Sequence, residues 1–265
     1  MRLSRAAFRI AAVIAGSLLM HGLAVAGDGA EAERVAKLAG VRTWHYQLQR
    51  IDLDELREST ADLLVIDYAK WRPPGPLTRA EVERLKRKPD GSRRVVLAYL
   101  SIGEAEDYRF YWQQEWHLAP PPWLVGENCE WRGNYLVRFW DPGWTDIVLG
   151  GGRSYLGRIQ EAGFDGVYLD RIDAFQPLQQ ERSDARAAMI EFVKQLAVTA
   201  RARDPAFLVL PQNADQLLAD ASYRDVIDGM GRESLILRGS GMGARDAEHI
   251  RRGVERLKRL SARGK

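Results

Sequence analysis

The chain has little cysteine and little histidine: one cysteine, Cys129, and four histidines among 265 residues. One cysteine cannot form an intrachain disulfide, so stability must come from a hydrophobic core. No cluster of cysteine and histidine has metal-site spacing, and no phosphate-binding glycine loop opens a helix after a strand. The scarcity of histidine and the lack of a Gly-x-Ser-x-Gly elbow argue against Ser/His/Asp catalysis. We therefore expect chemistry that needs neither a metal nor another cofactor.

The first 26 residues contain no acidic side chain and have the pattern of an export signal. Arg2, Arg5 and Arg9 begin it, an apolar run follows from Ile10 to Leu23, and Ala24-Val25-Ala26 supplies a small-x-small cleavage pattern. The run is short for a membrane span, which needs roughly 20 residues, although a retained anchor is the alternative. We expect cleavage near Ala26, a secreted or periplasmic protein, and no stable membrane insertion afterwards.

Without the leader the chain has no net charge, because 39 Lys and Arg less three leader arginines equal the 36 Asp and Glu. The charge is uneven, since residues 245–265 hold 8 basic and 3 acidic residues, which leaves an excess of about five acids over residues 27–244. A basic cluster confined to one end is typical of a solvated helix face rather than a nucleic-acid interface. We expect no nucleic-acid partner.

Short apolar runs alternate with amphipathic stretches, which is typical of a parallel sheet with helices between its strands. A capping box at Thr78 and Glu81 predicts one such helix, Ser183 is expected to cap another, and Ile250 to Leu260 give a third its apolar stripe. The seven strands expected are residues 44–48, 63–68, 95–100, 135–139, 166–169, 207–210 and 226–230.

Seven strands of this kind predict a (β/α)8 TIM barrel, one strand short, in which residues 27–265 form a single domain. The pattern Gly264-Lys265 predicts a turn after the last helix, where an eighth strand would begin. Either the count of strands is wrong or the barrel is truncated at its C-terminus, and truncation is the interpretation that we adopt as an expectation.

Acidic side chains stand where most of these strands end. The segment from Gly163 to Asp173 is the most informative, because its apolar run ends in Asp170 with Asp173 three positions later. In a barrel, the carboxyl ends of the strands converge on one face, where active sites lie. Each acid alone could equally cap a helix. The repetition at Asp67, Glu104 and Glu233 favours a functional site.

Two carboxyl groups that flank a scissile bond are the minimal apparatus of a glycosidase. Asp170 and Glu233 are the best pair, because each ends an apolar run that opens with Asp-Gly, at Asp165-Gly166 and at Asp228-Gly229. The parallel openings predict equivalent placement. Aromatic side chains crowd the same strand ends, and their flat faces suit a sugar ring. Among them we expect Tyr68, Tyr99 and Trp140 to bind substrate.

Several motifs in combination resemble the secreted endo-α-1,4-polygalactosaminidases, glycoside hydrolase family 114. They run from Trp44 to Glu233 and comprise Tyr46-Gln47-Leu48-Gln49, Val65-Ile66-Asp67-Tyr68, residues 98–106, Trp131-Arg132-Gly133-Asn134-Tyr135, Trp140-Asp141-Pro142-Gly143-Trp144, Gly163 through Asp173 and Gln212-Asn213-Ala214. The chain departs from the family pattern at Cys129, where a proline is expected, and in the missing eighth strand.

The resemblance implies a monomeric TIM-barrel hydrolase of α-1,4-linked galactosamine polymers in extracellular matrix or biofilm. It implies Asp170 as nucleophile and Glu233 as acid/base in a retaining mechanism, although the two roles could be exchanged. Asp67, Glu104 and Asn213 would bind or support the substrate, with Asp173 as a supporting acid.

The acid excess before residue 245 suits such a substrate, because a de-N-acetylated galactosamine polymer is cationic. Two alternatives stay open. The first is a non-catalytic carbohydrate-binding or matrix protein derived from such a hydrolase. The second is a hydrolase of another amino-sugar or galactose-containing polymer.

Overall fold

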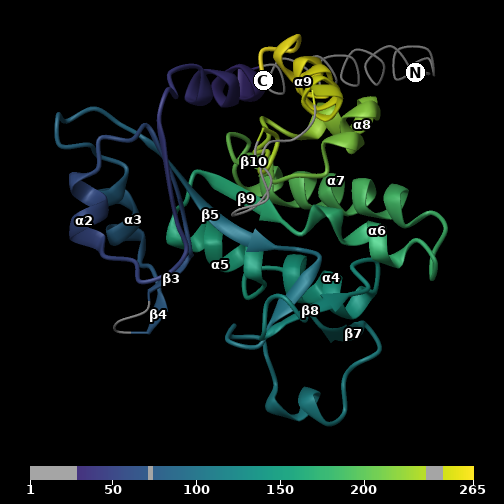
Figure 1. The fold of residues 1–265 in the computed structure, drawn as a ribbon. Coiled ribbons are helices and arrows are strands. Elements are labelled where there is room, and N and C mark those ends of the chain that lie inside the picture. Colours follow the sequence, from purple (N-terminus) through teal and green to yellow (C-terminus); the bar gives the residue numbers. More distant parts are fainter. Residues whose placement is uncertain (1–28, 71–73, 237–246) are drawn as a thin grey trace, which may run out of the picture.

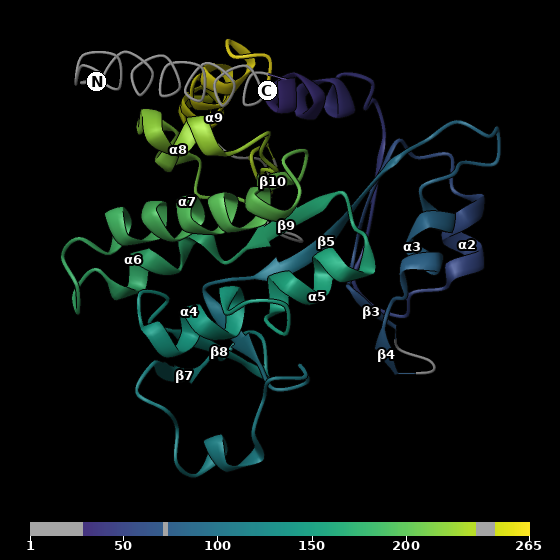
Figure 2. The same ribbon diagram turned by 180° about the vertical axis from the view of Figure 1, so that it is seen from behind.

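A computed structural model describes residues 29–70, 74–236 and 247–265 of the chain. The expected leader, residues 1–26, lies outside these ranges. The described residues form a mixed α/β structure around one parallel sheet, which Figures 1 and 2 show from opposite sides. Within these ranges, no helix has the length and apolar character needed to span a membrane.

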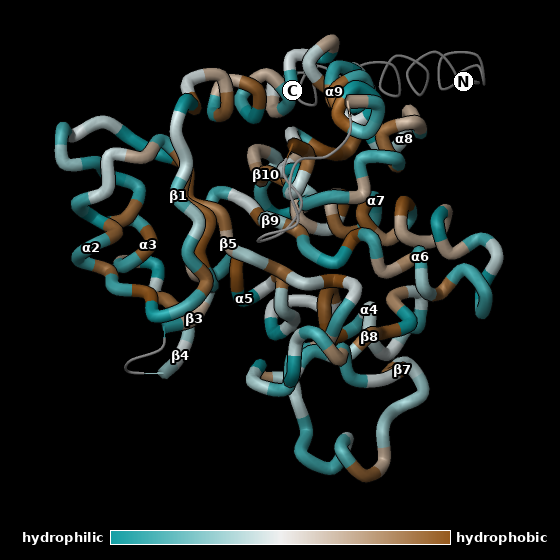
Figure 3. The backbone as a smooth tube through the Cα atoms, viewed as in Figure 1, coloured by the Kyte–Doolittle hydropathy of each residue, from teal (hydrophilic) through white to brown (hydrophobic). Residues whose placement is uncertain are grey.

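The main sheet has five parallel strands in the order β1-β2-β5-β9-β10, so the parallel α/β architecture is confirmed. The inner strands are buried along almost their whole length, as parallel strands covered on both faces must be. Their bounds are Trp44–Gln47 (β1), Leu63–Ile66 (β2), Val95–Ser101 (β5), Gly166–Asp170 (β9) and Leu208–Pro211 (β10). The strand β2 is hydrophobic over its whole length (Figure 3).

Helices cover the outer face of this sheet, with α2, α3 and α5 packed in sequence and α6, α7 and α8 packed in sequence. The capping box at Thr78 and Glu81 is present at the start of α3, as expected, whereas the cap of α7 is Asp184 rather than Ser183. The bounds are α2 (Leu53–Glu58), α3 (Arg79–Leu85), α4 (Pro142–Leu149), α5 (Tyr155–Ala162), α6 (Phe175–Leu178), α7 (Ala185–Arg203), α8 (Ala221–Val226) and α9 (Ala247–Ser261), with 3-10 turns η1 (Gln114–His117), η2 (Ile172–Ala174) and η3 (Asp215–Ala219).

The sheet is strongly curved. Strands β1 and β9 are three strand spacings apart, about 14 Å across a flat sheet. Nevertheless the rings of Tyr46 and Tyr168 have centroids 5.9 Å apart, and those of Trp44 and Tyr168 lie 6.3 Å apart. Side chains from distant strands can meet in this way only on a concave face, as in the wall of a barrel.

The two faces of the sheet carry separate cores. The larger core joins the outward side chains to the helices. The smaller core fills the concave face, and its members come from alternate positions of the strands: Leu63, Val65, Val95, Leu97, Tyr168, Leu208 and Leu210. Leu38 and Val41, which follow the helical segment 29–39, pack against it. The concave core is therefore covered in part by the segment that contains Leu38 and Val41.

Two aspartates hold the starts of two strands, β5 and β10, in the same way. Asp165 Oδ2 accepts from the Val96 amide of β5 at 2.9 Å, and Asp228 Oδ2 accepts from the Val209 amide of β10 at 2.8 Å. Each carboxylate also has cationic partners: Lys86 for Asp165, and Arg34 and Arg201 for Asp228. The Asp-Gly openings of the sequence thus mark equivalent positions in the fold.

Two of the seven expected strands are not part of the parallel sheet. Residues 134–137 do form β8 (Asn134–Val137), but it lies in a separate antiparallel sheet, β6-β8-β7, with β6 (Glu104–Glu106) and β7 (Leu124–Glu127). Alternating side chains predict a strand but not its partner, so the pattern could not reveal this. A further hairpin pairs β3 (Ala69–Lys70) with β4 (Gly75–Pro76).

The run expected as a strand at 226–230 is not one. Asp220 caps α8 by accepting from the amides of Ser222 and Tyr223, so helix continues to Val226. Among the residues that the structure describes, one parallel bridge, Gln212 with Gly231, continues the sheet beyond β10. The described ranges therefore contain five strands in the parallel sheet rather than seven, and the (β/α)8 barrel that lacks its eighth strand stays a prediction.

We expect the replacement of Asp228 by alanine to destabilise the fold strongly. It removes the acceptor for the Val209 amide and leaves the buried Arg34 and the largely buried Arg201 without their carboxylate, a loss of about 3–5 kcal/mol. Urea unfolding followed by circular dichroism measures the change. Asp225→Ala, at an exposed carboxylate paired with Arg263, is the control and should cost less than about 1 kcal/mol. Equal effects of the two variants would contradict the anchoring role.

Candidate active site

Asp170 and Glu233 stand at matching positions above the two anchors. Each lies five residues after its anchoring aspartate, Asp165 or Asp228. Asp170 ends β9, and Glu233 follows Gly231, whose amide donates to the Pro211 carbonyl at the end of β10 at 2.9 Å. Because Leu169 pairs with Pro211 and Gly231 pairs with Gln212, Asp170 and the segment of Glu233 lie on either side of the end of β10.

The Asp170 carboxylate is held rigidly from two sides. The Tyr99 hydroxyl donates to Oδ2 at 2.6 Å, and the Arg171 amide donates to Oδ1 at 2.7 Å. Arg171 has φ of 59°, an unfavourable conformation for a side chain other than glycine, and this geometry aims its amide at the carboxylate. Burial raises the pKa of Asp170 above the usual aspartate value, against the effect of these donors.

Glu233 is exposed, and Asn213 orients it. The Asn213 side-chain amide donates to Glu233 Oε2 at 3.1 Å, and its carbonyl oxygen accepts from the Glu233 amide at 3.0 Å. Asn213 and Ala214 both have positive φ, 62° and 51°, directly after β10. Strain of this kind at the end of a strand is typical of functional sites. The predicted substrate-binding residue Asn213 is therefore a direct partner of Glu233.

Tyr46 and Tyr168, two tyrosines that are not among the predicted site residues, lie near both acids. Burial and the charges of Asp170 and Glu233 raise the pKa of both hydroxyls. A side chain at Gly231 would collide with the Tyr168 hydroxyl, so that hydroxyl lies directly against the segment carrying Glu233. The spacing of Tyr168, two residues before Asp170 on the same face of β9, was the signal that could have identified it.

A second group of charges lies beside Asp170. Glu104, 1% exposed, accepts from the Asn128 side chain at 2.8 Å and pairs with Arg171 at 2.9 Å. Its Oε2 is buried without a hydrogen-bond partner, and burial raises the pKa of this carboxyl. Asp173 is half-exposed and lies 3.9 Å from the Arg171 guanidinium. Glu104 and Asp173, both predicted from sequence, thus adjoin Asp170 through Arg171.

Asp67 belongs to a third group centred on the buried Arg109. The Arg109 guanidinium pairs with Asp67 at 2.8 Å and with Glu106 at 2.5 Å. Burial, then the charge of Glu106, then that of Asp170 raise the pKa of Tyr99, so this group lies next to the Asp170 site. Glu106 belongs to the acidic stretch after the third expected strand, but only Glu104 of that stretch was assigned to the site, and Arg109 was not predicted.

Of two further predicted substrate-binding residues, Tyr68 adjoins the third group, because the Arg109 guanidinium carbon lies 5.8 Å from its ring centroid, whereas Trp140 has its contacts elsewhere. Tyr68 is only 4% exposed, and its ring packs edge-on against Phe110 and Tyr155 in the outer core. Trp140 contacts Phe139, and the guanidinium of Arg182 lies 5.1 Å from its ring. A role of either in substrate binding stays a prediction.

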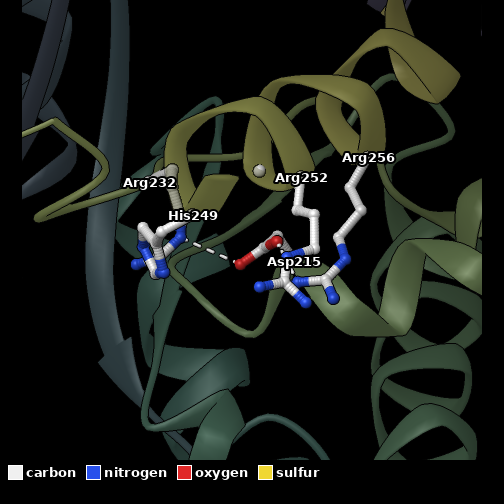
Figure 4. Close-up of a pocket in the computed structure, with 6 residues that line it drawn as sticks. Asp215, Arg232, His249, Arg252 and Arg256 are labelled. Atoms are coloured by element: carbon white, nitrogen blue, oxygen red, sulfur yellow. Dashed lines mark hydrogen bonds and ion pairs between the residues drawn. The ribbon is translucent and has the colours of Figure 1, made fainter. Parts of the chain in front are cut away.

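Helix α9 reaches the site through an arginine-lined pocket (Figure 4). Asp215, on η3, pairs with Arg256 of α9 and with Arg232, each at 2.9 Å. Arg232 also donates to Asn213 Oδ1 at 3.1 Å and to the Glu233 carbonyl at 2.5 Å. A chain of contacts therefore joins α9 to the residues that orient Glu233.

The chemistry that this arrangement supports is acid, base and nucleophilic catalysis by carboxylates. In the described part of the chain, no three His, Cys, Asp or Glu side chains are placed to hold a metal ion. Cys129 is exposed and unbonded. Two carboxylates at the edge of a curved parallel sheet, here Asp170 and Glu233, are the kind of arrangement that glycosidases use.

Sequence comparison assigns the family. The model of glycoside-hydrolase family GH114 matches residues 27–235, and the chain belongs to this family. A protein of Methanocaldococcus jannaschii is 36% identical over 230 residues, which are 84% of this chain and 64% of that protein. Relatives from Thermotoga maritima and Deinococcus radiodurans are each 39% identical, and the chain spans 59% and 61% of their lengths.

Two solved structures share the fold. One is the glycoside hydrolase domain of PelA from Pseudomonas aeruginosa, with a TM-score of 0.62, 20% identity, and coverage of 85% of this chain and 81% of that one. The other is Ega3 of Aspergillus fumigatus in complex with galactosamine, with a TM-score of 0.59, 18% identity and coverage of 85% and 74%.

We expect the Tyr99→Phe variant to raise the pKa of Asp170 further. The hydroxyl stabilises the ionised carboxylate, so its removal leaves the cost of burial less opposed. Carboxyl-carbon NMR titration should show the wild-type Asp170 pKa above about 3.9, the ordinary aspartate value, and the variant higher still. Tyr223→Phe, at a buried tyrosine whose hydroxyl has no hydrogen-bond partner, is the control. An unchanged or lower pKa in Tyr99→Phe would disprove the assignment.

Proposed function

We propose that this protein is a glycoside hydrolase that cleaves α-1,4-linked galactosamine-containing polysaccharide within the chain and with retention of configuration. The observation that supports the proposal is the placement of Asp170 and Glu233 at equal offsets from equivalent anchors, with Tyr46 and Tyr168 near both acids. Membership of GH114 supports the reaction class. The galactosamine complex of the structural neighbour Ega3 supports the sugar.

In this mechanism Asp170 is the nucleophile. Its two donors fix the direction of the carboxylate, and Glu233, being exposed, can reach both the leaving group and water. Glu233 gives its proton to the glycosidic oxygen as the bond from that oxygen to the anomeric carbon breaks. A carboxylate oxygen of Asp170 then forms a bond to the anomeric carbon. A retaining pair of this kind has its carboxyl groups about 5–5.5 Å apart.

Water completes the reaction. Glu233, now ionised, takes a proton from a water molecule whose oxygen attacks the anomeric carbon. The ester bond to Asp170 breaks, and the electron pair returns to its carboxylate. Two inversions give net retention, and Glu233 is protonated again for the next cycle. Asn213 keeps Glu233 oriented during both steps through its two hydrogen bonds.

The charges around the pair favour a cationic sugar. Beside Asp170, the carboxylates of Glu104, Asp173, Asp67 and Glu106 outnumber the guanidiniums of Arg171 and Arg109. An excess of negative charge at the carboxyl ends of the strands would attract the ammonium groups of a de-N-acetylated polymer, with an effect that salt weakens. We propose further that the protein is secreted or periplasmic and acts as a monomer, on the strength of the leader pattern and the family resemblance.

We expect Asp170→Asn and Glu233→Gln to abolish most hydrolysis. Each variant removes one carboxylate while it keeps the shape of the side chain, and loss of an acid/base alone costs about 10²–10⁴-fold. Reducing-end release from de-N-acetylated α-1,4-galactosamine polymer measures the effect, with the fully acetylated polymer assayed beside it.

The control for this experiment is Asp54→Asn, at an exposed carboxylate on α2 whose side chain is 90% accessible. Circular dichroism must show that all three variants fold. Unchanged release by Asp170→Asn or Glu233→Gln would disprove the site. Absence of release by the wild type, with retained binding, would favour a non-catalytic carbohydrate-binding protein.

A further inference from the structure

Tyr108 is a large aromatic side chain on the surface beside the acids. It follows β6 by two residues, and 62% of it is exposed. Exposed aromatic rings lose the stabilisation that burial would give, and proteins commonly use them for binding. The exposed ring is therefore suited to bind a ligand that has an apolar face.

The ring is nevertheless held in one orientation. Its hydroxyl donates to Oε1 of the buried Glu106 at 2.7 Å, and the Arg109 guanidinium carbon lies 5.0 Å from the ring centroid. Arg109 is itself fixed by Glu106 and Asp67. Because the Tyr108 hydroxyl is hydrogen-bonded and Arg109 beside the ring is held by two carboxylates, the ring loses little conformational freedom when a ligand packs on it.

The same network places Tyr108 next to the proposed reaction centre. Glu106 accepts from Tyr108, and its charge also raises the pKa of Tyr99 and of Tyr46. Tyr99 in turn donates to Asp170. A sugar packed on Tyr108 would therefore lie close to a sugar held between Asp170 and Glu233.

A second exposed ring, Trp131, lies on the neighbouring turn and is 63% exposed. The Asp107 amide, which precedes Tyr108, donates to the Gly133 carbonyl at 2.8 Å and joins the two turns. The start of the second turn is fixed as well, because the Asn128 side chain donates to Glu104. Both rings therefore belong to segments that are attached to the acid groups.

We infer that Tyr108, with Trp131 beside it, forms a binding subsite for an additional amino-sugar unit of the polysaccharide, outside the cleavage position. The C–H face of a pyranose would pack on the Tyr108 ring, and its ammonium group would be attracted to the ring and to the net negative group of Asp67, Glu106 and Arg109. The inference rests on the proposed function, because it assumes the same cationic polymer.

Calorimetric titration of the Asp170→Asn protein with de-N-acetylated α-1,4-galactosamine oligosaccharides tests the subsite without turnover. In this background Tyr108→Ala should weaken binding about tenfold, whereas Tyr108→Phe, which keeps the ring, should weaken it much less. Leu118→Ala is the control, because Leu118 is 93% exposed and lies at the end of η1. If Tyr108→Ala does not fold by circular dichroism, Tyr108→Leu takes its place, since it keeps apolar bulk without a π face.

Two results would overturn the inference. Binding unchanged by Tyr108→Ala would show that the ring is not used. Equal losses in Tyr108→Ala and Tyr108→Phe would show that the hydroxyl network, rather than the ring, carries the effect. The failure of the proposed function is distinguishable, because in that case the parent Asp170→Asn protein would itself bind no galactosamine oligosaccharide.

Discussion

The arrangement of this site depends on two aspartates, Asp165 and Asp228, whose carboxylates accept hydrogen bonds from backbone amides of strands β5 and β10. Asp165 and Asp228 each accept from the amide of a neighbouring strand and each pair with buried or largely buried cations. The chain then advances five residues in both cases before it presents an acid. Curvature of the sheet brings Tyr46 and Tyr168 together across the concave face, below those acids. The pairing of β9 with β10, and of Gln212 with Gly231, places the segments that carry Asp170 and Glu233 on either side of the end of β10.

Around these strands, the negative charges of the acids are balanced by arginines that lie beside them. Arg171 forms an ion pair with Glu104 and lies near Asp173. Arg109 forms ion pairs with Glu106 and Asp67. Arg232 forms an ion pair with Asp215. Each guanidinium is planar and can bind more than one carboxylate, so three arginines can keep several acids close together. Such networks cost free energy on desolvation, and their presence at strand ends is consistent with a functional rather than a stabilising purpose.

Much of the main sheet could be predicted from the sequence, because its strands are apolar runs bounded by polar turns. The starts of β1, β2, β5, β9 and β10 all fall within the expected ranges or one residue from them. The partner of β8 could not be predicted, since alternation identifies a strand without its neighbours. Within the site, the equivalence of the two Asp-Gly openings was visible in sequence. The group around Arg109 could not be predicted, because Arg109 and its partner Asp67 are 42 residues apart in the sequence and meet only in the folded chain.

The central claim is that Asp170 and Glu233 act as one retaining pair, and the stereochemistry of the first product tests it most directly. Proton NMR can follow the anomeric signal of the reducing end released from an α-1,4-linked galactosamine oligosaccharide before mutarotation. A pair about 5–5.5 Å apart predicts that the α-anomer appears first. Initial release of the β-anomer would contradict the account, because it requires a wider pair and direct attack by water.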